Sequence, residues 1–274
     1  MAAHAAAVKP DLLIHVGDYL YREDMCPLDS QAKCGGTATG DNWLTWNADF
    51  FAPAAKLLAS APWAVSRGNH EDCQRAWRGW FYYLDPHEYR ARVCQSFPAP
   101  YQVTLGKFEM VMLDSSAATE GQLAREQVRR FTAQFRSLQA SNAWLVAHHP
   151  FWRAAVISPL AAAWDRAAPK GIELVVSGHY HLFELLGFDQ NRPPQLIAGD
   201  GGTTLDLSSS NANRDGVAIH GARVVANEKE NVFGYTLLTK SVGGWNLLLQ
   251  DPAGKPLVAC SIRGTQVQCR AVGK

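Results

Sequence analysis

Four apolar segments of the chain are each followed by side chains that commonly bind metal ions. "DLLIHVG" precedes Asp18, "WAVSRG" precedes Asn69 and His70, "AWLVA" precedes His148 and His149, and "IELVVSG" precedes His179 and, two residues on, His181. Carboxylate, amide and imidazole donors without a thiolate suit zinc, manganese or iron. Because the carboxyl ends of strands in an open α/β sheet converge on one crevice, side chains this far apart in sequence can meet there. The pattern predicts a shared metal site with enough donors for two ions.

The segments that would position these side chains alternate between strand and helix. Short apolar runs that end abruptly in polar or glycine-containing sequence are typical of buried strands. The clearest predicted helix covers residues 120–139, where apolar residues spaced three or four apart share one face. A second helix is predicted over residues 41–60, with Asp41 as its N-cap. The alanine-rich opening of the chain predicts the last turns of another helix.

The remainder of the chain is typical of strands and tight turns. "YQVTLGKFEMVMLD" predicts a hairpin that turns at Gly106, Asp251-Pro-Ala-Gly predicts another turn, and the last fifty residues read as strands. No linker or internal repeat divides the chain. We therefore predict one α/β domain over residues 1–274, a layered α/β/β/α sandwich of two mixed sheets flanked by helices.

Composition limits the kind of partner. The chain has 274 residues and a formal net charge of +1, with no long run of one charge, which argues against a nucleic-acid or anionic membrane surface. The longest apolar segment, residues 50–65, is interrupted by Lys56 and two prolines, so no membrane span is predicted. We expect a small molecule as the partner, with no nucleic acid and no membrane.

Cysteine usage points to an oxidising compartment. Six cysteines fall into three near pairs along the chain: Cys26 and Cys34, Cys73 and Cys94, and Cys260 and Cys269. An even, locally paired set predicts three disulfides and a periplasmic or secreted protein, although spacing does not fix the connectivity. The alternative is six free buried thiols. Zinc binding by these cysteines is not expected, because none lies in a CxxC pair.

The order of four short motifs adds a family resemblance. Gly-Asp-x-x-Tyr begins at Gly17, Gly-Asn-His-Glu at Gly68, His-x-Pro at His148 and Gly-His-x-His at Gly178. In this order the chain resembles the calcineurin-like metallophosphoesterases and, within them, the purple acid phosphatases and their bacterial relatives. The motifs place the resemblance over residues 11 to about 205. It implies two metal ions, iron with zinc or manganese, or otherwise a pair drawn from zinc and manganese.

The resemblance also assigns a role to each motif residue. It implies that Asp18 bridges both metals and that Tyr21 and His181 bind the first. Asn69, His148 and His179 would bind the second. His70 would contact the phosphoryl group or protonate the leaving group without binding metal. Glu184 would lie next to the ligands without binding metal itself.

Several assignments keep an alternative. A slip of one residue would select His149 instead of His148, and strand alternation allows only one of them to face the metals. Tyr21 could pack over the site without coordinating iron. Arg22, Arg67 and Arg153 could bind phosphate oxygens or be ordinary ion-pair partners.

The resemblance implies hydrolysis of a phosphate monoester on a small phosphorylated substrate, by metal-activated water and with no protein nucleophile. A phosphodiesterase acting on cyclic nucleotides or similar diesters is the alternative within the family. The family's first motif, Asp-x-Gly or Asp-x-His, is not found before Asp11. We therefore expect an N-terminally truncated domain without its first strand, and a catalytically silent, metal-poor remnant is the remaining alternative.

Overall fold

A mixed sheet of eight strands forms the centre of the protein. The computed structural model describes residues 1–25, 35–88, 93–206 and 214–272, and the order of strands in this sheet is β3-β4-β5-β6-β8-β7-β10-β9. The strands are β3 (Tyr101–Leu105), β4 (Phe108–Leu113), β5 (Ala143–Ala147), β6 (Ile172–Ser177), β7 (Phe183–Phe188), β8 (Gln195–Ala198), β9 (Ala218–Ile219) and β10 (Ala222–Glu230). The run β4-β5-β6-β8 is parallel, and the outer pairs are antiparallel. The inner parallel strands are apolar along most of their length because both of their faces are covered.

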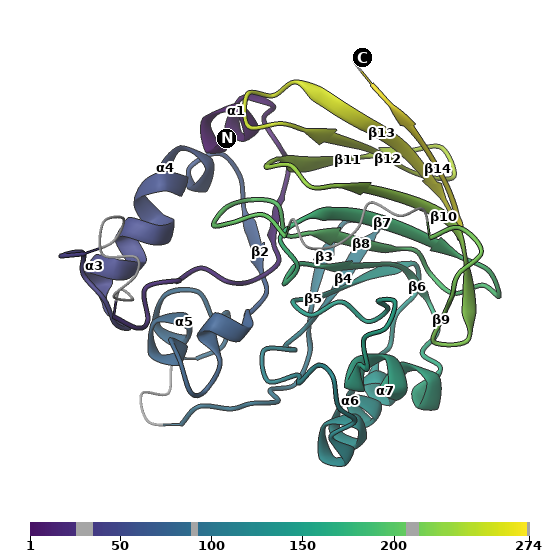
Figure 1. The fold of residues 1–274 in the computed structure, drawn as a ribbon, viewed down its shortest axis with the longest axis horizontal. Coiled ribbons are helices and arrows are strands. Elements are labelled where there is room, and N and C mark those ends of the chain that lie inside the picture. The colour runs from purple at the N-terminus through teal and green to yellow at the C-terminus, as the bar shows by residue number, and fades with distance from the viewer. Residues whose placement is uncertain (26–34, 89–92, 207–213, 273–274) are drawn as a thin grey trace.

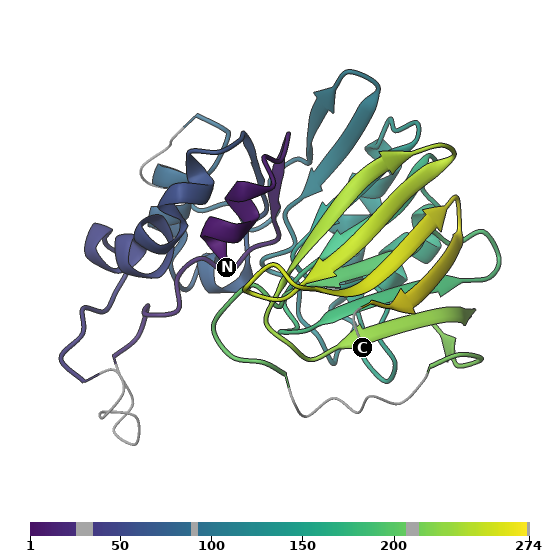
Figure 2. The same ribbon diagram turned by 90° about the horizontal axis from the view of Figure 1, so that it is seen from above.

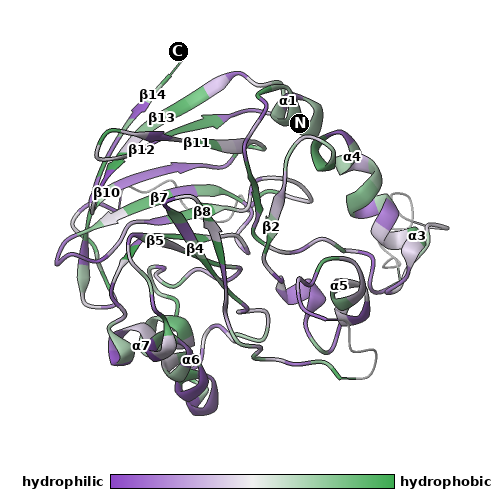
Figure 3. Ribbon diagram, turned by 180° about the vertical axis from the view of Figure 1, so that it is seen from behind, coloured by the Kyte–Doolittle hydropathy of each residue, from purple (hydrophilic) through white to green (hydrophobic). Residues whose placement is uncertain are grey.

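Two helices cover one face of this sheet. Helix α6 (Arg125–Ser137) and helix α7 (Pro159–Ala167) lie together below the large sheet in Figure 1. Val128, Phe131 and Phe135 of α6 are buried against the sheet, and α6 carries both hydrophilic and hydrophobic residues along its length (Figure 3). The amphipathic helix predicted over residues 120–139 is therefore confirmed, with its first turn at Arg125.

An antiparallel sheet covers the opposite face. Strands β11 (Tyr235–Ser241), β12 (Gly244–Gln250), β13 (Pro256–Arg263) and β14 (Gln266–Ala271) pair in sequence order, and Figure 2 shows this yellow-green sheet layered against the teal strands. Residues of both sheets form one apolar core between the layers. This second sheet is antiparallel rather than mixed as predicted, because each of its strands is joined to the next by a short turn. One of these turns is the predicted Asp251 turn, where the Asp251 N–H donates to the Lys255 carbonyl.

A smaller region carries the beginning of the chain. Strands β1 (Leu13–His15) and β2 (Trp63–Val65) pair in parallel, and helices lie beside them (Figure 1). The helical segments are α1 (Ala2–Ala7), α3 (Trp43–Trp46), a π-helical stretch (Asn47–Phe51), α4 (Ala52–Leu58), a 3₁₀ turn (Asn69–Glu71) and α5 (Trp77–Tyr83). Their core is largely aromatic and consists of Tyr19, Leu20, Trp46, Phe50, Ala76 and Trp80.

The structure confirms the predicted layered α/β fold with flanking helices, the hairpin at Gly106 and the opening helix. The predicted N-cap at Asp41 is wrong, because the Asn42 side chain accepts from the Leu44 and Thr45 N–H groups. Asp41 instead accepts from the Trp46 indole and from the Gly79 N–H, so it joins α3 to α5.

Two predicted disulfides are confirmed, Cys73–Cys94 and Cys260–Cys269. Cys26 and Cys34 lie outside the described residues. Across the described part of the chain, no helix combines the length and apolar character needed to span a membrane.

Candidate metal centre

The predicted ligand side chains meet where the small region adjoins the large sheet. Asp18 lies three residues after β1, and Asn69 begins the 3₁₀ turn after β2. His148 directly follows β5, and His179 lies two residues after β6. All four therefore follow the carboxyl ends of parallel strands, where the ends of neighbouring strands open a crevice.

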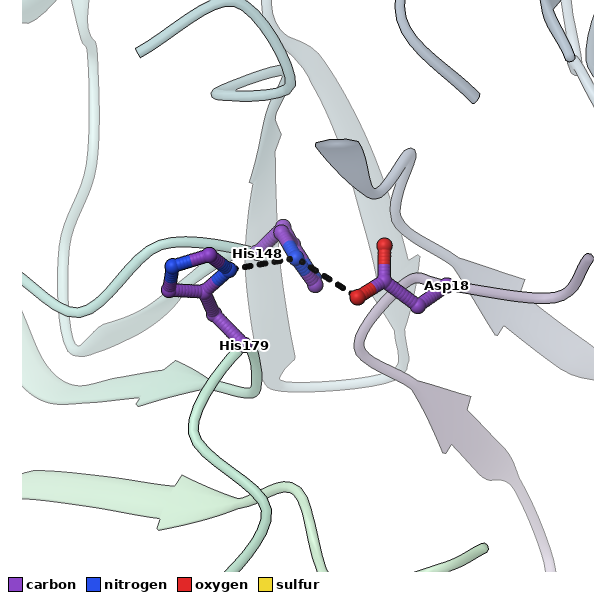
Figure 4. A group of neighbouring side chains, drawn as sticks. All are labelled: Asp18, His148 and His179. Carbon is purple, nitrogen blue, oxygen red and sulfur yellow. Dashed lines mark hydrogen bonds and ion pairs between the residues drawn. The ribbon is translucent and has the colours of Figure 1, made fainter. Parts of the chain in front are cut away.

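Distances among these side chains are short. Asn69 Oδ1 lies 2.9 Å from both His148 Nε2 and His179 Nδ1. His148 Nε2 lies 3.3 Å from Asp18 Oδ2 and 3.3 Å from His179 Nδ1. Figure 4 shows the His148 ring between the other two labelled side chains. Donor atoms of Asp18, His148 and His179 all fall within 4.8 Å of one another, close enough to share one cation.

The tautomer of His148 tests whether this group fits a metal. Its Nδ1 lies 2.7 Å from the Val16 carbonyl oxygen, which can only accept, so Nδ1 carries the hydrogen. In the neutral ring, Nε2 then points a lone pair at oxygens of Asn69 and Asp18. Burial lowers the pKa of His148, but the charge of Asp18 and its hydrogen bond raise it above the ordinary value. The site therefore favours positive charge at Nε2, and an oxygen and imidazole donor set fits a borderline divalent ion.

A second group of donors contacts the same oxygen of Asp18 as His148 does. The Tyr21 hydroxyl donates to Asp18 Oδ2 over 3.3 Å and lies 3.2 Å from His181 Nε2. Burial and the charge of Asp18 raise the pKa of Tyr21 far above its usual value. A phenolate at this position would therefore need a cation beside it. Asp18 is common to both donor groups.

Glu71 holds the two oxygen-bearing loops together. This carboxylate is fully buried and accepts four backbone N–H groups. Its Oε2 accepts from Gly68 and Asp18, each at 3.1 Å, and its Oε1 accepts from Tyr19 at 2.7 Å and Leu20 at 3.0 Å. Burial and the nearby charge of Asp18 raise the pKa of Glu71 above its usual range. No role was predicted for Glu71, although its place inside the Gly-Asn-His-Glu motif was a signal.

Backbone strain accompanies the site. Asp18 and His179 have φ values of 61° and 68°, in the left-handed region that non-glycine residues rarely adopt. Gly17 has φ 104°, and a Cβ there would lie 2.8 Å from the backbone of Gly68. The close approach of the two loops therefore requires glycine at position 17. Strain of this kind persists where surrounding contacts fix it, and it is common at functional sites.

His70 lies at the edge of the donor groups and contacts other residues. Its Nδ1 lies 2.7 Å from Glu23 Oε1, and its ring lies 4.1 Å from the Tyr21 ring between centroids. Arg75 Nη2 lies 2.8 Å from the same His70 nitrogen and forms an ion pair with Glu23. The backbone N–H of His70 donates to Asp18 Oδ1 over 3.1 Å. Glu23 and Arg75 were missed by sequence reasoning, since neither belongs to a predicted motif.

The other predicted residues have different surroundings. His149 is buried, with its ring centroid 4.2 Å from that of His179. Glu184 forms a buried ion pair with Arg214 over 2.8 Å. The three arginines considered as phosphate ligands have partners within the protein: Arg22 pairs with Asp49, Arg67 pairs with Asp114, and Arg153 covers the Tyr180 ring.

Comparisons with known proteins agree with this architecture. A family model described as calcineurin-like phosphoesterase matches residues 2–183. Among solved structures, a purple acid phosphatase from yellow lupin (Lupinus luteus) seeds shares 15% identity and a TM-score of 0.56, over 93% of this chain and 48% of that one. PhoD shares 12% identity and a TM-score of 0.61, over 100% of this chain and 69% of PhoD.

The GAP50 anchor in the inner membrane complex of Plasmodium shares 11% identity and a TM-score of 0.54, over 100% of this chain and 84% of GAP50. At these identities the three likenesses show the fold alone. The chain spans about half the length of the lupin phosphatase. No curated protein matches the sequence.

Proposed function

Because the chain belongs to the calcineurin-like phosphoesterase family, we propose that its metal centre hydrolyses phosphate monoesters of small phosphorylated molecules. One observation carries the proposal: two groups of metal donors meet on Asp18. Asn69, His148 and His179 form one group, and Tyr21 and His181 form the other. His148 Nε2 and the Tyr21 hydroxyl each lie 3.3 Å from Asp18 Oδ2. One carboxylate can bind two cations at once, so Asp18 can serve both groups.

The residues fit a pair of ions. Asp18, Asn69, His148 and His179 would hold one, and Asp18, Tyr21 and His181 would hold the other. Iron with zinc or manganese suits a set that includes a phenol, and a pair drawn from zinc and manganese is the alternative. When bound, such ions act as Lewis acids toward phosphate oxygens and lower the pKa of water.

His70 is placed to handle the proton of the leaving group. Glu23 engages His70 Nδ1 at 2.7 Å, so Nε2 is the nitrogen left to donate a proton to the departing alkoxide. Arg75 Nη2 lies 3.4 Å from His70 Nε2 and forms an ion pair with Glu23, so Arg75 keeps the Glu23 carboxylate beside the His70 ring. Asp18 accepts from the backbone N–H of His70, so one contact joins the residue of the proposed acid to the proposed metal bridge.

Metal content measured together with turnover of p-nitrophenyl phosphate tests the proposal. We expect about two metal ions per chain and activity that chelation removes, as in two-metal phosphatases. A protein that takes up no metal and has no activity would overturn the proposal in favour of a silent remnant. Faster turnover of bis(p-nitrophenyl) phosphate than of the monoester would show a phosphodiesterase instead.

We propose that the protein works in the periplasm or outside the cell. Two disulfides among the described residues support an oxidising compartment. Thiol titration after denaturation without reductant tests this. Reaction of all six cysteines in protein isolated from its native source would refute it.

A further inference from the structure

We propose that Glu120 is a positioning residue that fixes how His179 faces the metal centre. This inference rests on the proposed metal centre, and it concerns the side of the His179 ring that points away from it. His179 Nδ1 faces Asn69 and His148, whereas His179 Nε2 lies 3.7 Å from Glu120 Oε2. The two ring nitrogens thus have separate tasks.

The chemistry of a neutral imidazole explains why a carboxylate at this position matters. Only one ring nitrogen carries a hydrogen, and a nearby carboxylate favours the tautomer that points this hydrogen toward it. With the hydrogen on Nε2, the lone pair of His179 lies on Nδ1 and faces the other donors. Metal-binding histidines commonly donate their second N–H to such a partner, which orients the ring and raises its basicity.

Glu120 is itself held in place from outside the motif strands. It lies in the segment between β4 and α6, and its carboxylate accepts a hydrogen bond from the Tyr180 hydroxyl. Arg153 lies over the Tyr180 ring, with its guanidinium carbon 3.3 Å from the ring centroid. Within the described residues, Arg153 Nε and Nη1 are buried without a hydrogen-bond partner. The Tyr180 ring and the nearby negative charge of Glu120 therefore compensate the arginine charge.

His149 completes the surroundings of the His179 ring. Its buried ring lies against that of His179, with centroids 4.2 Å apart and planes inclined by 37°. The His179 backbone is in the left-handed region at φ 68°, so contacts beyond the local chain must hold the side chain in place. Glu120 acts at the edge of the ring and His149 at its face.

Calorimetric titration of the metal-free full chain with Zn²⁺ tests the inference by comparing the wild type with Glu120→Gln. This substitution keeps the shape of the side chain and removes its charge. We expect Zn²⁺ affinity at one of two sites to fall roughly 10- to 100-fold, as for other lost outer partners of metal-binding histidines. The second site should keep its affinity. Turnover of p-nitrophenyl phosphate should recover when Zn²⁺ is saturating.

Two further variants sharpen the result. Tyr180→Phe removes the hydrogen bond that holds Glu120, so we expect a weaker loss in the same direction. Glu126→Gln changes an exposed glutamate on α6 and should leave Zn²⁺ affinity unchanged. The melting temperature of metal-free Glu120→Gln should match that of the wild type, because a positioning role does not require Glu120 for folding.

Three outcomes overturn the inference. Equal Zn²⁺ affinity in wild type and Glu120→Gln would overturn it while leaving the proposed function intact. A lower melting temperature in the metal-free Glu120→Gln variant, together with weaker binding, would show that Glu120 has a structural role. A wild type that binds no metal ion at all would overturn the proposed function and this inference with it.

Discussion

The oxygen donors and the imidazole donors of the proposed metal centre come from regions that are built differently. His148 and His179 follow β5 and β6, inner strands of the eight-stranded sheet whose ends are packed between two apolar layers. Asp18 and Asn69 follow β1 and β2, strands of three residues that form a two-stranded sheet among the described residues. Burial of many side chains fixes the imidazole side, meaning the part of the site that follows β5 and β6. The oxygen side, which follows β1 and β2, has far less sheet to support it.

The difference shows how a small sheet can still hold a ligand loop. Glu71 accepts four backbone N–H groups from the Asp18 loop and its own turn. This one side chain supplies hydrogen bonds of the kind that neighbouring strands would supply in a wider sheet. The oxygen side therefore depends on a single residue. The imidazole side should tolerate the loss of any one contact better.

The largest expected effect comes from removing this residue. Glu71→Ala leaves four buried N–H groups without their acceptor, which we expect to cost about 3 to 5 kcal/mol of unfolding free energy. Turnover should fall to background because Asp18 loses its position. Denaturant unfolding and turnover of p-nitrophenyl phosphate measure both effects, with Glu126→Ala as an exposed control. A stable, active Glu71→Ala protein would mean that the strands alone hold the oxygen side.

The next effect separates catalysis from metal binding on the oxygen side. His70→Ala should lower kcat by roughly 10²- to 10⁴-fold, the usual contribution of a general acid. Metal content should not change, because the polar partners of the His70 ring are Glu23 and Arg75, and Asp18 accepts from the backbone N–H, which alanine keeps. His87→Ala is a matched control, since His87 is half-exposed and pairs with Asp85. Loss of metal from His70→Ala with kcat unchanged per bound metal would refute the assigned role.

A smaller effect concerns a buried carboxylate after β8 of the large sheet. Asp200 is 1% exposed, its Oδ2 lacks a hydrogen-bond partner among the described residues, and burial raises its pKa to about 6. The folded protein thus binds this proton more tightly than the unfolded chain. The stability linked to it is complete below about pH 4 and is lost as the pH rises through 6.

Asp200→Asn removes this dependence. At pH 7.5 the variant should be more stable than the wild type by about 2 to 3 kcal/mol, the free energy of a pKa difference of this size in a buried group. Urea unfolding at pH 4.5 and 7.5 measures the change. Parallel pH profiles for the two proteins would show that Asp200 is ionised in the folded state at both values.

The smallest expected effect tests the residue that joins the two sides. Tyr21 contacts Asp18 and His181, so Tyr21→Phe removes a contact between the regions. We expect a stability change below about 1 kcal/mol, as for one lost hydrogen bond. In iron-loaded protein the visible band from phenolate to iron should disappear. A colourless wild type that holds only zinc or manganese would contradict iron coordination by Tyr21.

The sequence predicted the strands and the motif residues because both are local signals. An apolar run that ends in Gly-Asp or Gly-His can be read without knowing what lies beside it, and Asp18 and His179 do meet in space. The partners of these residues could not be read in this way. Glu23 contacts His70 across 47 residues and Glu120 contacts His179 across 59, so each pairing depends on how distant loops pack.

Asp41 shows the same limit within one helix. Asp and Asn are both good N-caps, so composition alone does not choose between Asp41 and its neighbour Asn42. The choice follows from the tertiary contact of Asp41 with Gly79, 38 residues away. The N-cap prediction failed because the Asp41 side chain accepts hydrogen bonds from a distant segment rather than capping its own helix.

We expect the activity of a protein sample to depend on whether its Cys73–Cys94 disulfide has formed. Arg67 lies beside it, with Nη2 3.0 Å from Cys94 Sγ and Nη1 3.2 Å from Asp114. Cys73 is three residues beyond His70, so reduction would loosen the turn that carries the proposed acid and the proposed ligand Asn69, and leave the histidines of the large sheet in place. Protein made in a reducing cytoplasm should then turn over slowly even where the remaining ligands still hold metal. Full metal occupancy alone is therefore a poor guide to the quality of a sample.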